Sequence, residues 1–309
     1  MSRCCSPSRA TSIPAAPSQA WRAPGPVSHT WVDIGAGPAW LGSNTPEGFA
    51  SDGEGPARPV ELTAYRISAT AVTNAQFAAF VQATGYRTVA EDAGHSFVFY
   101  LQVPAEARAA LRHVVPDLPW WMIVPGAHWR TPHGPGSDWR LLADHPVVHV
   151  AWHDAHAYCE WSGTALPTEA QWEHAARGGA RSLRYPWGDE LEPGGAPRCN
   201  IWQGRFPNEP LPGWQPGTVP VNAFQANGFG LYNTSGNVWE WCADWFNPDY
   251  HRKTSDRDPR DERASGRRSQ RGGSFLCHAS YCTRYRTAAR GANTPDSSTS
   301  HTGFRVVAA

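Results

Sequence analysis

Two cysteines lie five positions apart in a C-terminal stretch that is rich in hydroxyl and basic side chains. Cys277 and Cys282 share the segment 271–286 with two serines, one threonine, a histidine and the arginines Arg271, Arg284 and Arg286. Nearby positive charge and hydrogen-bond donors stabilise a thiolate, so thiols in such surroundings ionise readily. This segment is therefore a candidate site of chemistry.

The Cys-x4-Cys spacing fits several structures: a local disulfide, half of a zinc site, a two-thiolate site for a soft ion, or two unrelated buried thiols. A zinc site needs four ligands, usually from a second Cys or His pair. The other cysteines offer no such pair outside the N-terminal tail. Two thiolates alone suit Cu(I), because thiolate is the ligand class that selects it. From spacing alone, buried thiols or a disulfide are the more common outcome.

The composition predicts the kind of fold that would position such a site. The chain has 309 residues with 29 Gly, 28 Pro and 16 Trp, which favours an α+β, loop-rich fold that packs around large aromatic side chains. The formal net charge is zero, so nothing favours binding to nucleic acid or to an anionic membrane. No apolar run is long enough to cross a membrane.

Local signals predict the elements around the cysteines. Alternating residues indicate strands at 31–35 and 60–67. Capping boxes start helices at Thr73 and Thr168, and glycines end them. Asp154 is expected to be the N-cap of a helix that ends at Gly163, which would place His149 on the preceding strand. His145, His149, His153 and His156 are interpreted as structural residues rather than metal ligands.

Several motifs together resemble one known family. The segment 271–286 is followed by Asn-Thr-Pro-Asp-Ser-Ser at 293–298 and Gly-Phe-Arg at 303–305, with further matches at 165–173, 185–188, 200–204, 228–233 and 236–241. This pattern resembles the aerobic bacterial formylglycine-generating enzymes, also called sulfatase-modifying factors. The resemblance covers about residues 30 to 309 as a single catalytic domain. It implies a C-type-lectin-like fold with little regular secondary structure.

The resemblance implies an activity and a set of site residues. Members of the family are copper-dependent oxidases that use O2 to convert the cysteine of a Cys-x-Pro-Ser-Arg motif in sulfatases to Cα-formylglycine. In this sequence the matching positions would bind Cu(I) through two thiolates and line the oxygen pocket, and one histidine would either shuttle protons or bond to backbone. These residues are Cys277 and Cys282 for copper, Ser274, Tyr281 and Trp239 for the pocket, and His278.

Other matching positions concern the substrate and calcium. Glu91 is expected either to bind the substrate arginine or to be a solvated surface acid. A structural Ca2+ is expected at four positions, through side-chain and backbone oxygens. A second Ca2+ site would begin at Asn200 and Ile201, but the loop 208–214 is shorter than the family form, which puts that site in doubt. The residues of the first site are Asn233, Gly236, Val238 and Glu240.

Residues 1–29 read as a disordered tail because they are rich in Ser, Ala and Pro without a hydrophobic period. Inside this tail, residues Cys5 to Arg9 have the form Cys-x-Pro-Ser-Arg. Two interpretations remain open. The match is a coincidence or the result of a wrongly chosen start codon, or the tail is a self-substrate or a tethered competitor for the site.

Two other functions also remain open. A catalytically silent member of the same fold would be a binding module for peptide or sugar, and the thiol pair argues against it. Iron-dependent sulfoxide synthases share the fold but depend on a histidine triad in an added helical domain, which we do not find in the sequence. Seven cysteines, an odd number, favour a reducing, cytoplasmic compartment over a disulfide framework.

Overall fold

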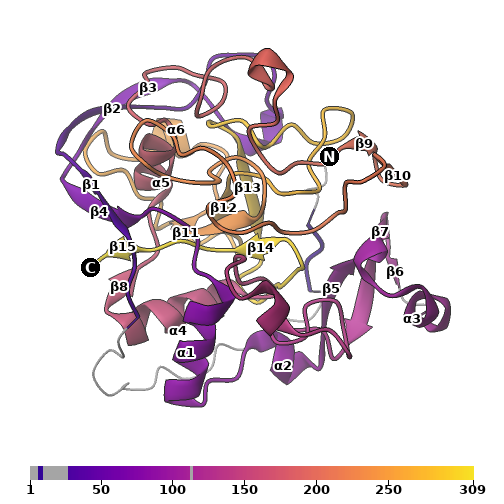
Figure 1. Ribbon diagram of the computed structural model, residues 1–309. Coiled ribbons are helices and arrows are strands. Elements are labelled where there is room, and N and C mark those ends of the chain that lie inside the picture. Colours follow the sequence, from indigo (N-terminus) through magenta and orange to yellow (C-terminus); the bar gives the residue numbers. More distant parts are fainter. Residues whose placement is uncertain (1–5, 10–26, 112–113) are drawn as a thin grey trace.

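The computed structural model describes residues 6–9, 27–111 and 114–309 and consists of short helices and strands joined by long loops (Figure 1). This confirms the α+β, loop-rich architecture expected from the composition. The strands are β1 (Trp31–Ile34), β2 (Gly37–Leu41), β3 (Arg58–Leu62), β4 (Tyr65–Ser68), β5 (His95–Phe99), β6 (Val114–Val115), β7 (Leu118–Pro125), β8 (Thr164–Ala165), β9 (Gly204–Arg205), β10 (Glu209–Pro210), β11 (Trp239–Trp245), β12 (Arg268–Arg271), β13 (Arg290–Asn293), β14 (Thr302–Gly303) and β15 (Val307–Ala308). The helices are α1 (Asn74–Thr84), α2 (Val89–Ala93), α3 (Ala105–Ala110), α4 (Trp152–Ser162), α5 (Glu169–Ala176) and α6 (Tyr250–Lys253), with short 3-10 turns at Ala50–Asp52, Tyr100–Gln102, Trp139–Leu142 and Pro193–Gly195.

Two four-stranded sheets hold the chain together. One has the strand order β1-β4-β15-β8, and the other has the order β13-β12-β11-β14. In the second sheet β11 pairs antiparallel with β12 and parallel with β14. Figure 1 shows this sheet near the middle of the molecule, with α1 and α4 below it and the β5-β7-β6 sheet at one corner. The strand β12 ends at Arg271, so it delivers the chain directly into the cysteine segment.

The helix starts at Thr73 and Thr168 are confirmed. Each threonine side chain accepts a hydrogen bond from the N–H of the residue three positions on, and the glutamine there bonds back to the threonine N–H. The expectation for Asp154 was wrong. The N-cap of α4 is Ala151, and Asp154 lies inside the first turn, where its carboxylate accepts the Ala151 N–H at 2.8 Å.

Two strand expectations are corrected by the chain path. The run at 60–67 is divided between β3 and β4, which belong to different sheets. His149 lies in no strand, since its φ of 60° places it in the left-handed region. Its ring is buried and hydrogen-bonded at both nitrogens, to the Ser96 hydroxyl and the Pro132 carbonyl oxygen.

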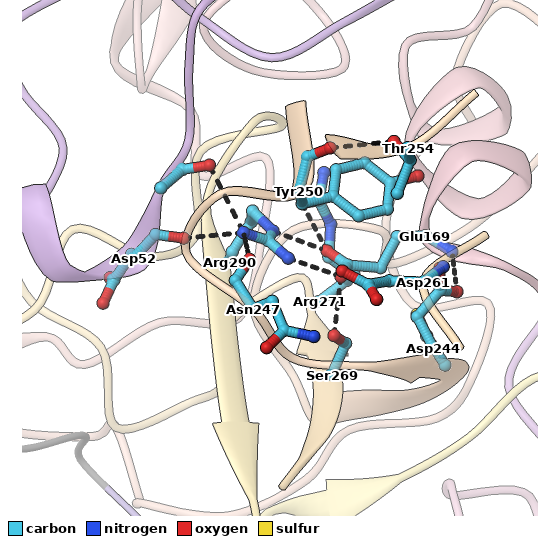
Figure 2. A network of polar contacts seen from close by, with 12 residues as sticks. Asp52, Glu169, Asp244, Asn247, Tyr250, Thr254, Asp261, Ser269, Arg271 and Arg290 are labelled. Atoms are coloured by element: carbon cyan, nitrogen blue, oxygen red, sulfur yellow. Dashed lines mark hydrogen bonds and ion pairs between the residues drawn. The ribbon is translucent and has the colours of Figure 1, made fainter. Parts of the chain in front are cut away.

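Buried arginines and glutamates join α5 to the sheet that carries the cysteine segment (Figure 2). Glu169 accepts two hydrogen bonds from the Arg290 guanidinium, both at 2.7 Å, and one from Arg271 at 3.3 Å. Glu173 accepts from Arg271 and Arg177, each at 2.6 Å. A buried charge is tolerated only when it is paired and hydrogen-bonded, and these charges are.

The Glu173 carboxyl group keeps its charge to low pH. Burial alone would raise the pKa of Glu173, but Arg271 and Arg177 outweigh it and lower the pKa from 4.5 to about 2. A carboxyl group with a lowered pKa stabilises the fold above its unfolded pKa, and this contribution is lost as the pH falls through the folded pKa. The contribution of Glu173 is therefore complete above about pH 4.5 and disappears toward pH 2.

The tryptophans pack inside the fold, as the composition predicted. Trp121, Trp129, Trp172, Trp202, Trp239 and Trp241 are among the largest fully buried side chains. Their large side chains fill the space between the short helices and strands. Across residues 6–9, 27–111 and 114–309, no helix is both long and apolar enough to span a membrane.

We expect Glu169→Gln to lower the free energy of unfolding by about 3–5 kcal/mol, because it leaves buried guanidinium charge without its counter-ion. The matched control is Glu209→Gln, which removes a carboxylate from an exposed pair with Arg205 and should change stability by less than about 0.5 kcal/mol. Urea unfolding of both variants measures this. Equal stability of the two variants would contradict the role given to Glu169.

Candidate functional site

The two cysteines of the C-terminal segment face each other in the interior. Their sulfur atoms are 3.4 Å apart and both side chains are buried. A disulfide bond has an S–S length of about 2.05 Å, so the two sulfurs are not bonded to each other. A tight turn makes this meeting possible, because the His278 carbonyl oxygen accepts the N–H groups of Tyr281 and Cys282, at 2.9 and 2.7 Å.

Glycine is required where the segment leaves β12. Gly273 has a φ of 71°, and a Cβ built there would lie 2.9 Å from the Arg284 carbonyl oxygen and 3.0 Å from Tyr285 Cα. Only a residue without a side chain lets these two stretches of backbone come so close. The contact holds the first part of the segment against the part that follows Cys282.

Hydrogen-bond donors are directed at both sulfurs. The backbone N–H of Ser274 points to Cys277 Sγ at 3.4 Å, and Arg284 Nη1 lies 3.8 Å from Cys282 Sγ. Arg284 is itself fixed by a buried ion pair with Asp52, whose carboxylate accepts from Nε at 2.5 Å and from Nη2 at 3.2 Å. A fixed cation and an N–H donor both favour the thiolate over the thiol.

Aromatic side chains enclose the sulfur atoms. Trp239 is fully buried in the same apolar cluster as Cys277 and Cys282, and Tyr281 packs against that cluster. The Tyr281 ring stacks on Phe206, with ring centroids 4.7 Å apart, and meets Trp120 edge to face at 5.0 Å. The Trp239 Nε1 atom is buried and has no hydrogen-bond partner within residues 6–9, 27–111 and 114–309.

The predicted site residues thus divide into two groups. Cys277, Cys282, Ser274, Trp239 and Tyr281 come together. The ring of His278 instead lies at the surface end of the turn, where Nδ1 is 2.7 Å from the Ser280 hydroxyl. This contact favours a structural role for the histidine over a proton shuttle at the sulfurs.

A histidine that the sequence analysis did not single out lies beside the pair. His301 is buried, and its Nδ1 is 3.0 Å from the Ser274 hydroxyl. Burial lowers the pKa of His301 to about 3, so the ring is neutral and one nitrogen donates while the other accepts. His301 lies in the C-terminal signature between 293–298 and 303–305, and that position was its only sequence signal.

Glu91 lies in α2. Its carboxylate accepts the N–H and hydroxyl of Thr88, at 2.8 and 2.9 Å, and forms an ion pair with Arg130 at 3.4 Å. These bonds cap the N-terminus of α2, so Glu91 has a structural role. Binding of a substrate arginine by Glu91 stays a prediction.

The residues predicted for calcium lie in loops that are tied together. Asn200 donates to the Gly217 carbonyl oxygen at 2.8 Å and forms an isolated β-bridge with Gly236. Asn233 fits a cation, because its Oδ1 is buried and accepts no hydrogen bond from the described part of the chain. Glu240 fits less well, since both of its carboxylate oxygens accept hydrogen bonds from Arg305.

The other positions named for calcium show no comparable feature. Val238 and Ile201 are buried apolar residues, and Ile201 belongs to the same apolar cluster as Cys277 and Cys282. The Glu240 carboxylate also accepts the Trp172 Nε1–H at 2.6 Å. The second site, at Asn200 and Ile201, stays a prediction.

Comparison with known proteins places this site in a family. The model of the sulfatase-modifying factor enzyme 1-like domain matches residues 20–309. The chain belongs to this family. Among its relatives in the family is the formylglycine-generating enzyme of Thermomonospora curvata, 54% identical over 291 residues, which are 93% of this chain and 96% of the relative. The enzyme of the same name from Streptomyces coelicolor is 51% identical over 298 residues, 94% and 95% of the two chains.

The sulfatase-modifying factor family also contains a protein named as inactive, from mouse, which is 42% identical over 279 residues, 89% of this chain and 84% of that protein. Membership alone therefore does not decide activity. Among solved structures, PvdO from Pseudomonas aeruginosa matches with a TM-score of 0.63 at 22% identity, over 90% of this chain and 93% of that one. This likeness shows the fold and nothing more.

The side chains of the site fit Cu(I) in this family member. Two buried sulfur atoms 3.4 Å apart are close enough for one ion to contact both, and paired thiolates are the ligands that select a soft monovalent ion. The remaining described thiols differ. Burial raises the pKa of Cys159 and of Cys199 to about 12, which keeps both protonated and poor as ligands.

We expect Cys277→Ser and Cys282→Ser each to weaken Cu(I) binding by more than about 100-fold, because even changes outside the ligand sphere of a metal cost about 10–100-fold. The control is Cys159→Ala, which removes a protonated core thiol and should leave copper affinity unchanged. Competition with a Cu(I) chelator measures all three. Retained affinity in both serine variants would exclude the pair as the copper site.

Proposed function

We propose that this protein is a copper-dependent oxidase that converts the cysteine of a Cys-x-Pro-Ser-Arg motif in sulfatases to Cα-formylglycine with O2. The observation that carries the proposal is the buried pair of sulfurs, Cys277 and Cys282, 3.4 Å apart among donors that favour the thiolate. Relatives more than half identical over almost the whole chain are named formylglycine-generating enzymes. They support the same reaction here.

The reaction balances with a thiol reductant. The substrate carbon goes from thiol to aldehyde and gives up two electrons, while O2 takes up four and is reduced to water. A thiol reductant supplies the other two electrons and two protons. The net products are the aldehyde, hydrogen sulfide and one molecule of water, and the thiol reductant becomes a disulfide.

Copper, when bound, supplies the soft centre that accepts thiolate ligands and reacts with O2. The residues of the site stabilise negative charge at the sulfurs and exclude water. Arg284 and the Ser274 N–H hold negative charge at the sulfurs. Trp239 and Tyr281 exclude bulk water from them, which strengthens the electrostatic interactions in the site. The buried Trp239 Nε1–H is available to donate to a reduced oxygen species.

A silent binding module is the second candidate, because the family includes a protein named as inactive. A module that only binds peptide has no need for two facing thiols with a fixed guanidinium beside them. The buried pair therefore favours the enzyme. The proposal also places the protein in a reducing compartment such as the cytoplasm, supported by the buried thiols Cys159, Cys199 and Cys242.

We expect a Cys-x-Pro-Ser-Arg peptide incubated with the protein, Cu(I), O2 and a thiol reductant to lose about 18 mass units, the change from thiol to aldehyde. The loss should be absent with Cys277→Ser and Cys282→Ser and present with Cys159→Ala. Mass spectrometry of the peptide measures this. No conversion by protein that has bound copper would exclude this substrate motif, and no copper binding would favour the silent module.

Calcium is proposed as a structural ion at Asn233, where the buried Oδ1 accepts no hydrogen bond from the described residues. Binding to the folded state alone raises stability by about 2.7 kcal/mol at 100 times Kd. We therefore expect saturating Ca2+ to raise the Tm of the protein but not of Asn233→Ala. Asn208→Ala, an exposed position, should respond like the unaltered chain. An equal Tm rise in all three proteins would place the ion elsewhere.

A further inference from the structure

The short N-terminal segment 6–9 packs against the folded domain although it precedes the domain by many residues. Figure 1 shows it as an indigo trace between β5 and the C-terminal loops. Ser6 and Pro7 are buried. The composition predicted a disordered tail over 1–29, and residues 6–9 differ because β5 and the loop 293–301 supply hydrogen-bond partners that the tail sequence alone does not reveal. Cys5 lies outside the described residues.

Arg9 is held by several acceptors at once. Its Nη2 donates to the His95 carbonyl oxygen at 2.8 Å and to the Ser298 hydroxyl at 3.2 Å, and Nε donates to the Asp296 carbonyl oxygen at 3.0 Å. Nη1 lies 2.9 Å from His95 Nε2. The guanidinium carbon also lies 5.9 Å from the centroid of the Phe97 ring. Such a set of partners is specific for the planar fork of an arginine.

Asn293 fixes the register of the segment. Its Nδ2 donates to the Pro7 carbonyl oxygen at 2.9 Å, and its Oδ1 accepts the Ser8 hydroxyl at 2.6 Å. The Asn293 amide thus donates a hydrogen bond to one residue of the segment and accepts one from the next. The Arg9 backbone N–H adds a bond to the Ser297 hydroxyl at 2.9 Å. All four residues of the segment are therefore bound, when the contact of Ser6 is included.

Ser6 connects the segment to the sulfur pair. Its hydroxyl is 2.8 Å from His301 Nε2, and His301 Nδ1 is 3.0 Å from the Ser274 hydroxyl. The Ser274 N–H in turn points to Cys277 Sγ. Cys5 immediately precedes Ser6, and consecutive Cα atoms are about 3.8 Å apart. The bound segment thus ends one residue before its cysteine, beside residues that contact the candidate copper ligands.

We propose that residues Cys5 to Arg9 are an intramolecular substrate, in which bound Ser6 to Arg9 present the Cys5 thiol to the Cys277 and Cys282 pair. This inference rests on the proposed function. The Cys5 carbon is oxidised from thiol to aldehyde by O2, with two further electrons and two protons from a thiol reductant, and sulfur leaves as hydrogen sulfide. Until it is displaced, the bound segment also competes with peptides from other proteins for the same binding residues.

The two halves of the proposal are measured separately. Binding is tested on metal-free full chain with a fluorescent peptide of the Cys-x-Pro-Ser-Arg form in which serine replaces cysteine. Effective concentrations of tethered ligands reach about 1 mM, so we expect Arg9→Ala to bind this peptide about tenfold or more tighter than the unaltered chain. Arg3→Ala is the matched control, and it should bind like the unaltered chain. Equal Kd for all three proteins would overturn the docking of the segment.

Modification is tested by peptide mapping of the full chain after incubation with Cu(I), O2 and a thiol reductant. We expect a loss of about 18 mass units at Cys5, no loss at the neighbouring Cys4, and a rate that does not change on tenfold dilution. Arg9→Ala should slow it at least tenfold. If Cys5 stays unmodified while an added peptide is converted, the self-substrate proposal is overturned. If neither Cys5 nor the added peptide is converted while the Kd difference remains, the oxidase is refuted and the segment is a bound competitor only.

A rate at Cys5 that falls in proportion to dilution would also overturn the proposal, because it would show that one molecule modifies another. Loss of mass at Cys4 as well as Cys5 would overturn it too, since it would indicate thiol oxidation without recognition of the motif.

Discussion

The pairing of two buried glutamates with buried arginines is the constraint on which the rest of the structure depends. Glu169 binds the Arg290 guanidinium through both carboxylate oxygens, and Arg290 also donates to the Asp52 carbonyl oxygen at 2.9 Å (Figure 2). The Asp52 carboxylate binds Arg284, whose Nη1 faces Cys282 Sγ. A continuous line of charge-assisted hydrogen bonds therefore runs from α5 to the site. Buried pairs of this kind add little net stability against an apolar core, but they tolerate only one arrangement of their partners.

That single arrangement matters because the fold has little regular structure to impose geometry. The cysteine segment has no helix or strand of its own between β12 and β13. Its shape depends on Arg271 at its start, on the close approach at Gly273 and on the turn closed by the His278 carbonyl oxygen. Aromatic rings then fill the surrounding space. Precise placement of two sulfurs in a loop requires this many fixed neighbours, since a loop without them would be mobile.

His301 links the bound segment 6–9 to the residues beside the sulfur pair. A neutral imidazole can donate from one nitrogen and accept at the other, so His301 joins a bound hydroxyl to Ser274 without bringing a charge into the pocket. Asn293 and Ser298, which also contact the segment, belong to the C-terminal signature, whereas His95 belongs to the β5-β7-β6 sheet. The contacts of residues 6–9 therefore come from two parts of the chain that are far apart in sequence, β5 and the C-terminal signature.

The sequence by itself determined the family resemblance, the loop-rich α+β class and the capped starts of α1 and α5. It also determined the dithiol with Ser274, Trp239 and Tyr281. These features could be predicted because capping residues, glycines and clustered motifs act on residues that are close in the sequence. It did not determine the partners of Glu91 and Glu240, the surface position of His278, the place of Asp154 within α4, or the importance of His301. Those depend on which residues meet across long sequence separations, as Glu240 meets Arg305 and residues 6–9 meet Asn293. Only the tertiary structure decided these contacts, because burial and desolvation determine whether a charged side chain binds a ligand or a neighbour.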